Sequence, residues 1–197
     1  MRSIFRAALC GAALTLLLGG CAPTPPDTFE TPDAASETDA ESAQPAGVMS
    51  PFSATDLEGN PLDQSMLAGK KLTLVNVWAT YCTPCIGEMP DLGALAQAYA
   101  DKDVQIVGLV SDVLDSDGQV SDTQLATARD IVAETGANYT HIVPSPDLYH
   151  ILAQVTAVPT TFFVDETGAQ VGTAILAAQS RDTWAQTIDA MLAEVGA

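Results

Sequence analysis

The sequence predicts one α/β domain in which a mixed β-sheet is covered on both faces by helices. Apolar, β-branched runs of strand length alternate with stretches whose apolar residues recur at helical spacing. Two later extended runs are separated by a hairpin signal. The chain has 197 residues, of which 47% are hydrophobic, and this is enough for one domain with a real core plus extensions.

In the first half of the domain, a turn signal is followed by a strand, a helix and a second strand. Residues 56–60, Asp-Leu-Glu-Gly-Asn, favour a turn between two short extended pieces, and so predict an N-terminal β-hairpin. Residues 72–78 and 104–110 are apolar, β-branched runs of the kind found in buried strands. Between them, apolar side chains recur at helical spacing over residues 84–99.

The second half is predicted to contain two more long helices and a hairpin. A helix is expected over 121–134, because Asp122 and Thr123 lie near its start and Gly136 follows its end. The other expected elements are a short extended segment at 139–143, a helical segment at 146–153, strands at 160–165 and 170–174 joined by a turn at 166–168, and a helix at 180–195 with Ser180 as its N-cap.

The first 20 residues have the order of a secretory signal peptide. Residues 1–6 carry two arginines, and residues 7–18 form an apolar run that is too short to span a bilayer, which takes ~20 apolar residues. Cys21 follows two glycines, which resembles a bacterial lipobox, where the cysteine receives a thioether-linked diacylglycerol and the preceding segment is removed. The alternative is an ordinary signal peptide that contains a cysteine. We expect Cys21 to anchor the protein on the outer side of a bacterial membrane.

The segment after Cys21 is predicted to be an extended tether. Residues 22–47 contain five prolines and six acidic residues, with no lysine or arginine, so they lack the apolar surface needed for folding. A random coil of that length spans roughly 30 Å. The expected organisation is therefore a signal peptide at 1–20, a lipidated cysteine and tether at 21–47, and a folded domain at 48–197.

The charge of the chain excludes one class of partner. Seven basic residues face 25 acidic ones, for a net charge of −18, and removal of the two signal-peptide arginines makes the balance more negative. Nucleic acid is not expected to bind, because its phosphates must be met by lysine and arginine. The acidity favours solubility and basic or neutral partners.

The spacing of the last two cysteines raises three possibilities: a staple, a metal site or a redox centre. With the first two of the four cysteines assigned to the signal peptide and the lipid, only Cys82 and Cys85 remain as thiols. A disulfide across two intervening residues restrains the unfolded chain very little, which disfavours a staple. Zinc would need two more ligands, and His141 and His150 lie nine residues apart on different predicted elements.

A redox centre fits the spacing better. Disulfide exchange needs an accessible thiolate and a resolving thiol that reaches it. Cys82 and Cys85 lie on the same side of the first turn of the predicted helix. Cys82 is expected at the helix N-terminus, where unpaired N–H groups and the helix dipole favour the thiolate, and Cys85 is expected to be more buried. Pro84 costs little in that first turn.

Three motifs together resemble a known family. They are Trp-Ala-Thr-Tyr-Cys-Thr-Pro-Cys at 78–85, Glu-Met-Pro at 88–90, and Val-Pro-Thr-Thr-Phe-Phe-Val-Asp at 158–165. They resemble the extracytoplasmic thioredoxin-like proteins of the TlpA/ResA type over about 48–197. A lipobox and a tether are common attachments in that family.

The resemblance implies a thioredoxin-like fold and a role for each motif residue. It implies Cys82 as the attacking nucleophile, Cys85 as the resolving thiol, and a cis peptide bond before Pro159, which faces the pair. It matches Glu88 to the acidic residue that tunes the thiol pKa values in this family. Thioredoxin carries a buried Asp where this chain has Asn76, so the acid–base role would pass to Glu88. A carboxylate near a thiolate raises the thiol pKa through repulsion.

The function expected from the resemblance is a monomeric protein-disulfide reductase. Its substrates would be proteins with disulfides or thiols, such as apocytochrome c during cytochrome c maturation or an oxidised repair enzyme. A thiol electron donor in the membrane would re-reduce it, and the Cys82–Cys85 disulfide would be its only redox group, with no cofactor or metal. One alternative is a copper(I) metallochaperone that uses the two thiols as soft ligands, although no Met or His ligand lies nearby. A redox-inactive interaction module is another, and residues 113–122 have no assigned role.

Overall fold

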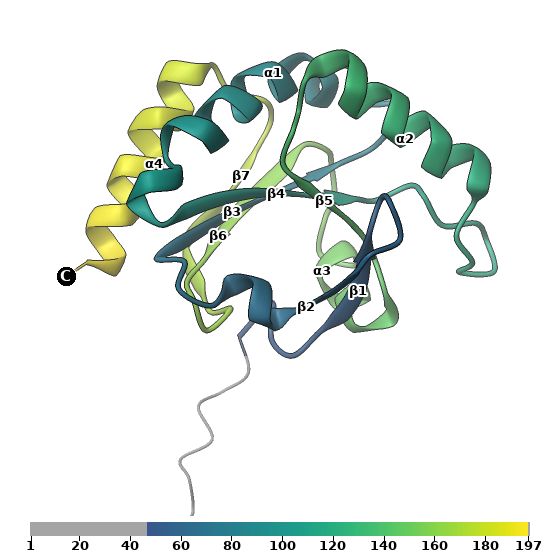
Figure 1. Cartoon of the computed structure of the whole chain (residues 1–197), viewed down its shortest axis with the longest axis horizontal. Coiled ribbons are helices and arrows are strands. Elements are labelled where there is room, and N and C mark those ends of the chain that lie inside the picture. Colours follow the sequence, from purple (N-terminus) through teal and green to yellow (C-terminus); the bar gives the residue numbers. More distant parts are fainter. Residues whose placement is uncertain (1–46, 197) are drawn as a thin grey trace, which may run out of the picture. The chain divides into compact units, whose positions relative to one another are not determined.

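The computed structural model describes residues 47–196 (Figure 1). The expected signal peptide, the expected lipid-carrying Cys21 and almost all of the expected tether lie outside the described residues. Among residues 47–196, no helix has both the length and the apolar character that crossing a membrane requires.

The domain is built on a mixed sheet of seven strands in the order β2-β1-β5-β4-β3-β6-β7. The strands are β1 (Ser53–Asp56), β2 (Pro61–Asp63), β3 (Leu72–Trp78), β4 (Val104–Val110), β5 (Thr140–Val143), β6 (Thr160–Val164) and β7 (Gln170–Leu176). β4 is parallel to both β3 and β5, and every other neighbouring pair is antiparallel. The β1–β2 hairpin forms one edge and β7 the other, which confirms the predicted mixed sheet and N-terminal hairpin.

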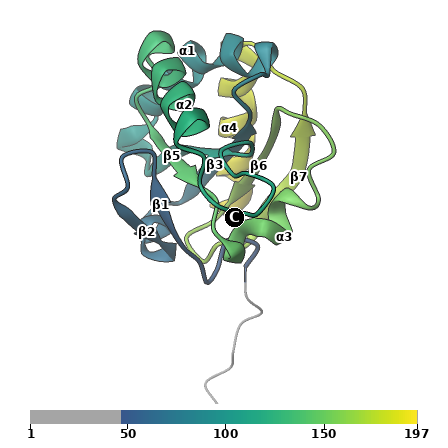
Figure 2. The same ribbon diagram turned by 90° about the vertical axis from the view of Figure 1, so that its right-hand side faces the viewer.

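Three long helices cover one face of the sheet, and shorter helical segments cover the other (Figures 1 and 2). The long helices are α1 (Thr83–Ala98), α2 (Asp122–Thr135) and α4 (Arg181–Val195), and the short segments are α3 (Tyr149–Leu152) and the 3₁₀ turns η1 (Gln64–Leu67) and η3 (Pro146–Leu148). A third 3₁₀ turn, η2 (Ala100–Lys102), continues α1 on the side of the long helices. Apolar residues of α1 and α4 pack with β3, β4 and β6 in one cluster. η1, η3 and α3 contribute to the cluster on the opposite face.

The central strand β3 decides which residues face the long helices. All seven of its residues are buried, and successive side chains point to opposite faces of a sheet. Leu72 and Leu74 belong to the cluster under α1 and α4, whereas Val75 and Val77 belong to the opposite cluster. Asn76 therefore faces the long helices, as a fully buried polar side chain on an apolar face.

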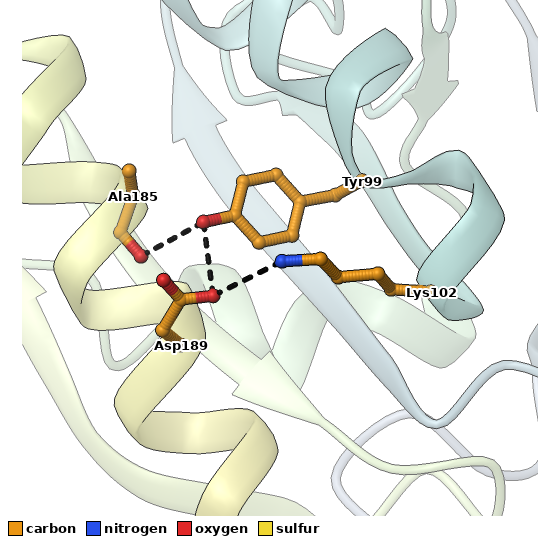
Figure 3. A network of polar contacts seen from close by, with 4 residues as sticks. All are labelled: Tyr99, Lys102, Ala185 and Asp189. Atoms are coloured by element: carbon orange, nitrogen blue, oxygen red, sulfur yellow. Dashed lines mark hydrogen bonds and ion pairs between the residues drawn. The ribbon is translucent and has the colours of Figure 1, made fainter.

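A polar network fastens the end of α1 to the middle of α4 (Figure 3). The Tyr99 hydroxyl lies 3.1 Å from the carbonyl oxygen of Ala185 and 3.0 Å from the Asp189 carboxylate. Lys102 Nζ lies 3.5 Å from the same carboxylate and 4.3 Å from the centre of the Tyr99 ring. Both charged groups of this ion pair are more than half exposed, so the hydroxyl contacts contribute more to docking than the charges.

Most predicted elements are present, with small changes at their ends. The strands at 72–78 and 104–110 have the predicted bounds, and α1, α2 and α4 each start within one residue of the predicted position. The helical segment expected at 146–153 is instead η3 followed by the single turn of α3. The unassigned segment 113–122 folds back on itself, with a bridge between Leu114 and Val120.

Candidate active site

The two cysteines lie where β3 passes into α1. Cys82 is the N-cap of α1 and Cys85 lies in its first turn, and a disulfide joins them with 5.3 Å between their Cα atoms. The Cys85 backbone N–H donates to Cys82 Sγ over 3.3 Å. An N-cap sulfur that accepts a free helix N–H is in the position that favours a thiolate. Cys82 retains 5% exposure and Cys85 none, so Cys82 is the cysteine that an incoming group reaches.

The loop before Cys82 is held from the neighbouring strand end. Thr80 donates its backbone N–H to the Asp112 carboxylate over 3.0 Å and its hydroxyl over 2.6 Å. Gln124 of α2 donates to the same Asp112 carboxylate over 3.3 Å. Tyr81 is left 75% exposed beside Cys82, and it borders a hollow of about 150 Å³ that also includes Val158. An exposed aromatic side chain and a hollow with apolar residues thus lie next to Cys82 in the chain.

Pro159 lies at the same end of the sheet as the cysteines. The Val158–Pro159 peptide bond is cis, as the resemblance implies. Thr160 begins β6 and pairs with Val77, two strand positions before the loop that leads to Cys82. Val158 packs against the cluster that contains both cysteines. The residue before Pro159 thus lies against the cysteine cluster, and the contact of Pro159 itself with the pair stays a prediction.

Glu88 is buried on α1, one turn beyond Cys85, with 3% exposure. It follows Cys85 by three residues on α1, which places both side chains on one side of the helix. Its Oε1 accepts from Asn76 Nδ2 over 2.9 Å, and its Oε2 accepts from Gln179 N over 3.1 Å and from Trp184 Nε1 over 3.0 Å. Burial raises the pKa of Glu88, and the three donors act in the opposite direction.

Asn76 links Glu88 to the strand that follows Pro159. Its Nδ2 also donates to the Thr161 hydroxyl over 2.9 Å, whereas its Oδ1 has no hydrogen-bond partner among the described residues. A buried acceptor without a partner is uncommon and costs stability. Asn76 therefore has one unused acceptor on the amide that contacts Glu88.

Sequence reasoning missed the donors to Glu88 from the last part of the domain. Trp184 lies on the buried face of α4, and a buried indole N–H usually finds a partner. Helical spacing indicates that Trp184 is buried, but it does not indicate which acceptor its N–H meets. The Gln179 backbone N–H gives no sequence signal of any kind.

The two histidines do not join the cysteine site. His141 is buried, accepts from Trp78 Nε1 over 3.2 Å at Nδ1, and lies 3.0 Å from the Ala137 carbonyl at Nε2. Burial lowers the pKa of His141 to about 4. His150 is exposed and contacts the Val48 carbonyl over 2.9 Å. Among residues 47–196, no cluster of three or more His, Cys, Asp or Glu has the arrangement of a metal site.

The family model and the similar proteins found for this chain agree on one family. The Redoxin family model matches residues 39–187. The thiol-disulfide oxidoreductase ResA of Bacillus thuringiensis is 31% identical over 120 residues, which are 61% of this chain and 63% of that protein. The chain thus matches less than two thirds of the length of that relative. The thiol:disulfide interchange protein HelX of Rhodobacter capsulatus is 30% identical over 169 residues, which cover 85% of this chain and 82% of HelX.

A solved structure supports the fold. The crystal structure of a thiol:disulfide interchange protein of the thioredoxin family from Chlorobium tepidum superposes with a TM-score of 0.59 at 25% identity. It covers 76% of this chain and 99% of its own. The thioredoxin-like fold predicted from the sequence is confirmed. The chain belongs to the Redoxin family, and within it to the thioredoxin-fold thiol–disulfide oxidoreductases related to ResA and HelX.

Proposed function

We propose that the chain is a membrane-anchored, extracytoplasmic oxidoreductase that reduces disulfides of substrate proteins through Cys82 and Cys85. The observation that carries this proposal is the position of the pair at the N-terminus of α1. Cys82 is the N-cap and the only one of the two with exposed surface, and a buried carboxylate, Glu88, lies one turn beyond Cys85.

The reaction consists of two exchanges and transfers two electrons. In the reduced protein, the Cys82 thiolate attacks one sulfur of a substrate disulfide, so that a Cys82–substrate bond forms while the substrate S–S bond breaks. The released substrate thiolate takes up a proton. Cys85 then loses its proton and attacks Cys82 Sγ, which forms the Cys82–Cys85 disulfide and releases the second substrate thiolate, which is also protonated. A dithiol donor in the membrane reverses the change in the cysteine pair.

Glu88 is proposed to handle the proton of the cysteine pair. It lies one helical turn beyond Cys85 on α1, and it is shielded from water. Its charge opposes a thiolate on either cysteine. Strongly oxidising dithiols owe their potential to a stabilised reduced form. A buried carboxylate beside the pair acts against that stabilisation, which favours the role of a reductant.

Trapping tests the reaction. In Cys85→Ser, the attack by Cys82 proceeds but the mixed disulfide is not resolved, so covalent adducts with substrate proteins are expected to accumulate and to disappear with dithiothreitol. The matched variant Cys82→Ser should form none. Adducts in Cys82→Ser and none in Cys85→Ser would reverse the two roles, and adducts in neither would contradict disulfide exchange. Trapped apocytochrome c or an oxidised repair enzyme would identify the substrate.

The proposed membrane anchor rests on the sequence before the described residues. A lipobox cysteine carries at least two acyl chains, and two chains are enough for stable anchoring, whereas one is marginal. Cys21→Ala should therefore move the protein from the membrane fraction to the soluble fraction with its disulfide exchange intact. Retention of the Cys21→Ala protein in the membrane fraction would contradict the anchor without affecting the proposed reaction.

A further inference from the structure

Two of the three hydrogen bonds to Glu88 come from one late segment of the chain. The Gln179 backbone N–H and the Trp184 indole N–H both donate to Oε2, over 3.1 and 3.0 Å, from positions 91 and 96 residues after Glu88. We call the turn 177–179 together with Trp184 the C-terminal clamp. Since a fixed carboxylate needs both oxygens directed, the clamp determines where Oε2 points, and Asn76 contacts only Oε1.

The same clamp also contacts the segment that precedes β6. The Ala177 backbone N–H donates to the Pro159 carbonyl over 3.0 Å. Ala177 has φ +84, a backbone conformation that is unfavourable for a residue with a Cβ atom. The turn therefore keeps an unfavourable residue conformation at the point where it meets both Pro159 and Glu88. Strained backbone of this kind is concentrated at functional sites.

We propose that Trp184 is a positioning residue of the disulfide exchange, which holds the Glu88 carboxylate in place for proton exchange with the cysteine pair. The inference rests on the proposed function and adds a residue that lies outside all three sequence motifs. Trp184 does not itself contact the reacting sulfurs in this scheme. It acts through Glu88, because its N–H is fully buried and donates only to that carboxylate.

The surroundings of Glu88 decide the direction of the effect. The titratable groups near it are Cys85 one turn earlier on α1, Cys82 at the N-cap of that helix, and Tyr139 next to β5, whose pKa is raised by burial and then by the charge of Glu88. Its neighbours from β3 and α4, Asn76 and Trp184, carry no charge. All three hydrogen bonds to Glu88 are donated to it, and donors favour the ionised carboxylate. Loss of one donor favours the protonated form, which repels a thiolate less.

Trp184→Phe removes the N–H and keeps an aromatic ring in the core. We expect the pKa of Glu88 to rise by about one unit, read from the ¹³C carboxyl shift in oxidised protein labelled on glutamate. In the reduced protein, the thiolate absorbance titration should move to lower pH, part of the way to that of Glu88→Gln. The double variant Trp184→Phe/Glu88→Gln should titrate like Glu88→Gln alone, because Trp184 acts through Glu88.

Tyr99→Phe is the matched control. It removes the hydroxyl that docks the middle of α4 (Figure 3) and leaves every donor to Glu88 in place. It should lower the melting temperature without moving either titration. If Tyr99→Phe shifts the titrations as much as Trp184→Phe, or if Trp184→Phe leaves the Glu88 shift unchanged, Trp184 only packs and the inference is wrong.

Two further measures keep the outcome decisive. If Trp184→Phe does not fold, benzothienylalanine at position 184 keeps the two-ring shape and carries a sulfur atom in place of the N–H donor. The carboxyl titration uses oxidised protein without any substrate, so it reports on Trp184 even in a protein that fails to exchange disulfides. Absent exchange in the wild type would overturn the proposed function, whereas an unmoved Glu88 titration would overturn the positioning role.

Discussion

The domain contains two buried pairs, each made of a tryptophan and a titratable residue. The two pairs differ in whether burial and the tryptophan hydrogen bond favour the same protonation state of the titratable residue. Trp78 donates to His141 over 3.2 Å, and Trp184 donates to Glu88 over 3.0 Å. Both indoles are fully buried on the face of the sheet that the long helices cover. At His141, burial and the Trp78 hydrogen bond favour the same state, because Nδ1 can accept from Trp78 only in the neutral ring. Nε2 meets the Ala137 carbonyl, and this bond raises the pKa but is outweighed by burial.

At Glu88 the two influences are opposed. Its hydrogen bonds are all donated to it and favour the ion, whereas burial favours the neutral acid and raises the pKa. Agreement between burial and the tryptophan hydrogen bond holds His141 in its neutral form, as expected for a residue that only packs. Where burial opposes the donated hydrogen bonds, a small change in the surroundings of the carboxyl group is enough for it to gain or lose its proton. Acid–base chemistry requires such a group. The two pairs share the same degree of burial, and the opposition at Glu88 supports its proposed role in proton exchange.

The largest expected effect is an acid instability that belongs to His141. Its pKa is lowered from 6.5 to about 4 in the fold, so below pH 6.5 the unfolded chain binds a proton that the folded protein does not. Stability should therefore fall as pH drops from 6.5 to 4, by about 3 kcal/mol at most from this group. In His141→Gln this component is absent, and denaturant unfolding against pH measures it. The control is His150→Gln, which changes an exposed histidine. If the difference in the free energy of unfolding between wild type and His141→Gln does not depend on pH, the interpretation that the fold holds His141 neutral is wrong.

A smaller effect is expected at the cysteine pair when the charge of Glu88 is removed. Glu88→Gln keeps the shape of the side chain and removes the repulsion of a thiolate on Cys85 or Cys82. At least one thiol pKa of the reduced protein should fall by about one unit, or ~1.4 kcal/mol, and the pH dependence of exchange should flatten. The three groups titrate as a coupled set, so the values belong to the set. Thiolate absorbance against pH is the measurement.

Two controls sharpen the Glu88 result. Glu134→Gln removes an exposed carboxylate from α2 and should leave the thiol titration unchanged.

The pH dependence of the free energy of unfolding is a second, independent test of Glu88. Because the folded pKa of Glu88 is raised above its ordinary value of 4.5, the wild type loses stability as pH rises from 4.5 through the folded pKa. Glu88→Gln should therefore gain stability relative to wild type over that range, and superimposable thiol titrations would show that Glu88 has no influence on the cysteines.

The smallest expected effect concerns the turn on the Glu88 side. Ala177 has φ +84, whereas none of the residues of the His141 pair has a positive φ. Relief of strain in Ala177→Gly gains ~1–2 kcal/mol, and the extra freedom of glycine in the unfolded chain costs ~0.5–1 kcal/mol. The net increase in the free energy of unfolding should be about 0.5 kcal/mol by denaturant titration. Ala177→Val, with a branched Cβ, should be destabilising, and a stable Ala177→Val protein would mean that the turn is unstrained.

Much of the fold was predictable because its central strands are buried on both faces. β3 and β4 are continuous apolar runs with clear ends, and their bounds are the predicted ones. The side chains of Ser180 and Ser121 accept hydrogen bonds from the backbone at the starts of α4 and α2. Because serine is a common N-cap residue, these helix starts can be predicted from the sequence. The short segment 146–153 was harder, since one turn of 3₁₀ and one of α-helix leave no periodicity to read.

The site was predictable only where its residues are close in the sequence or belong to a motif. The cysteine pair and the nearby Glu88 come from one helix, and the cis bond before Pro159 followed from the family resemblance. The contact between Trp184 and Glu88 joins residues 96 positions apart. The helical spacing of apolar residues predicts that Trp184 is buried. The acceptor of its N–H depends on how α4 packs against the rest of the domain, which the spacing does not predict. The bond from Asn76 to Glu88 likewise depends on the packing of α1 over β3.

The distance along the chain between Glu88 and Trp184 has a consequence for biosynthesis. A ribosome adds ~5–20 residues per second, so the 96 residues between them take roughly 5–20 s to make. During that interval a nascent chain already contains both cysteines, while the indole that orients the carboxylate has not been synthesised. Thiol chemistry on such a chain is governed by the local helix and the oxidant present. The proposed acid–base control through Glu88 is therefore incomplete until Trp184 has been made and α4 has docked.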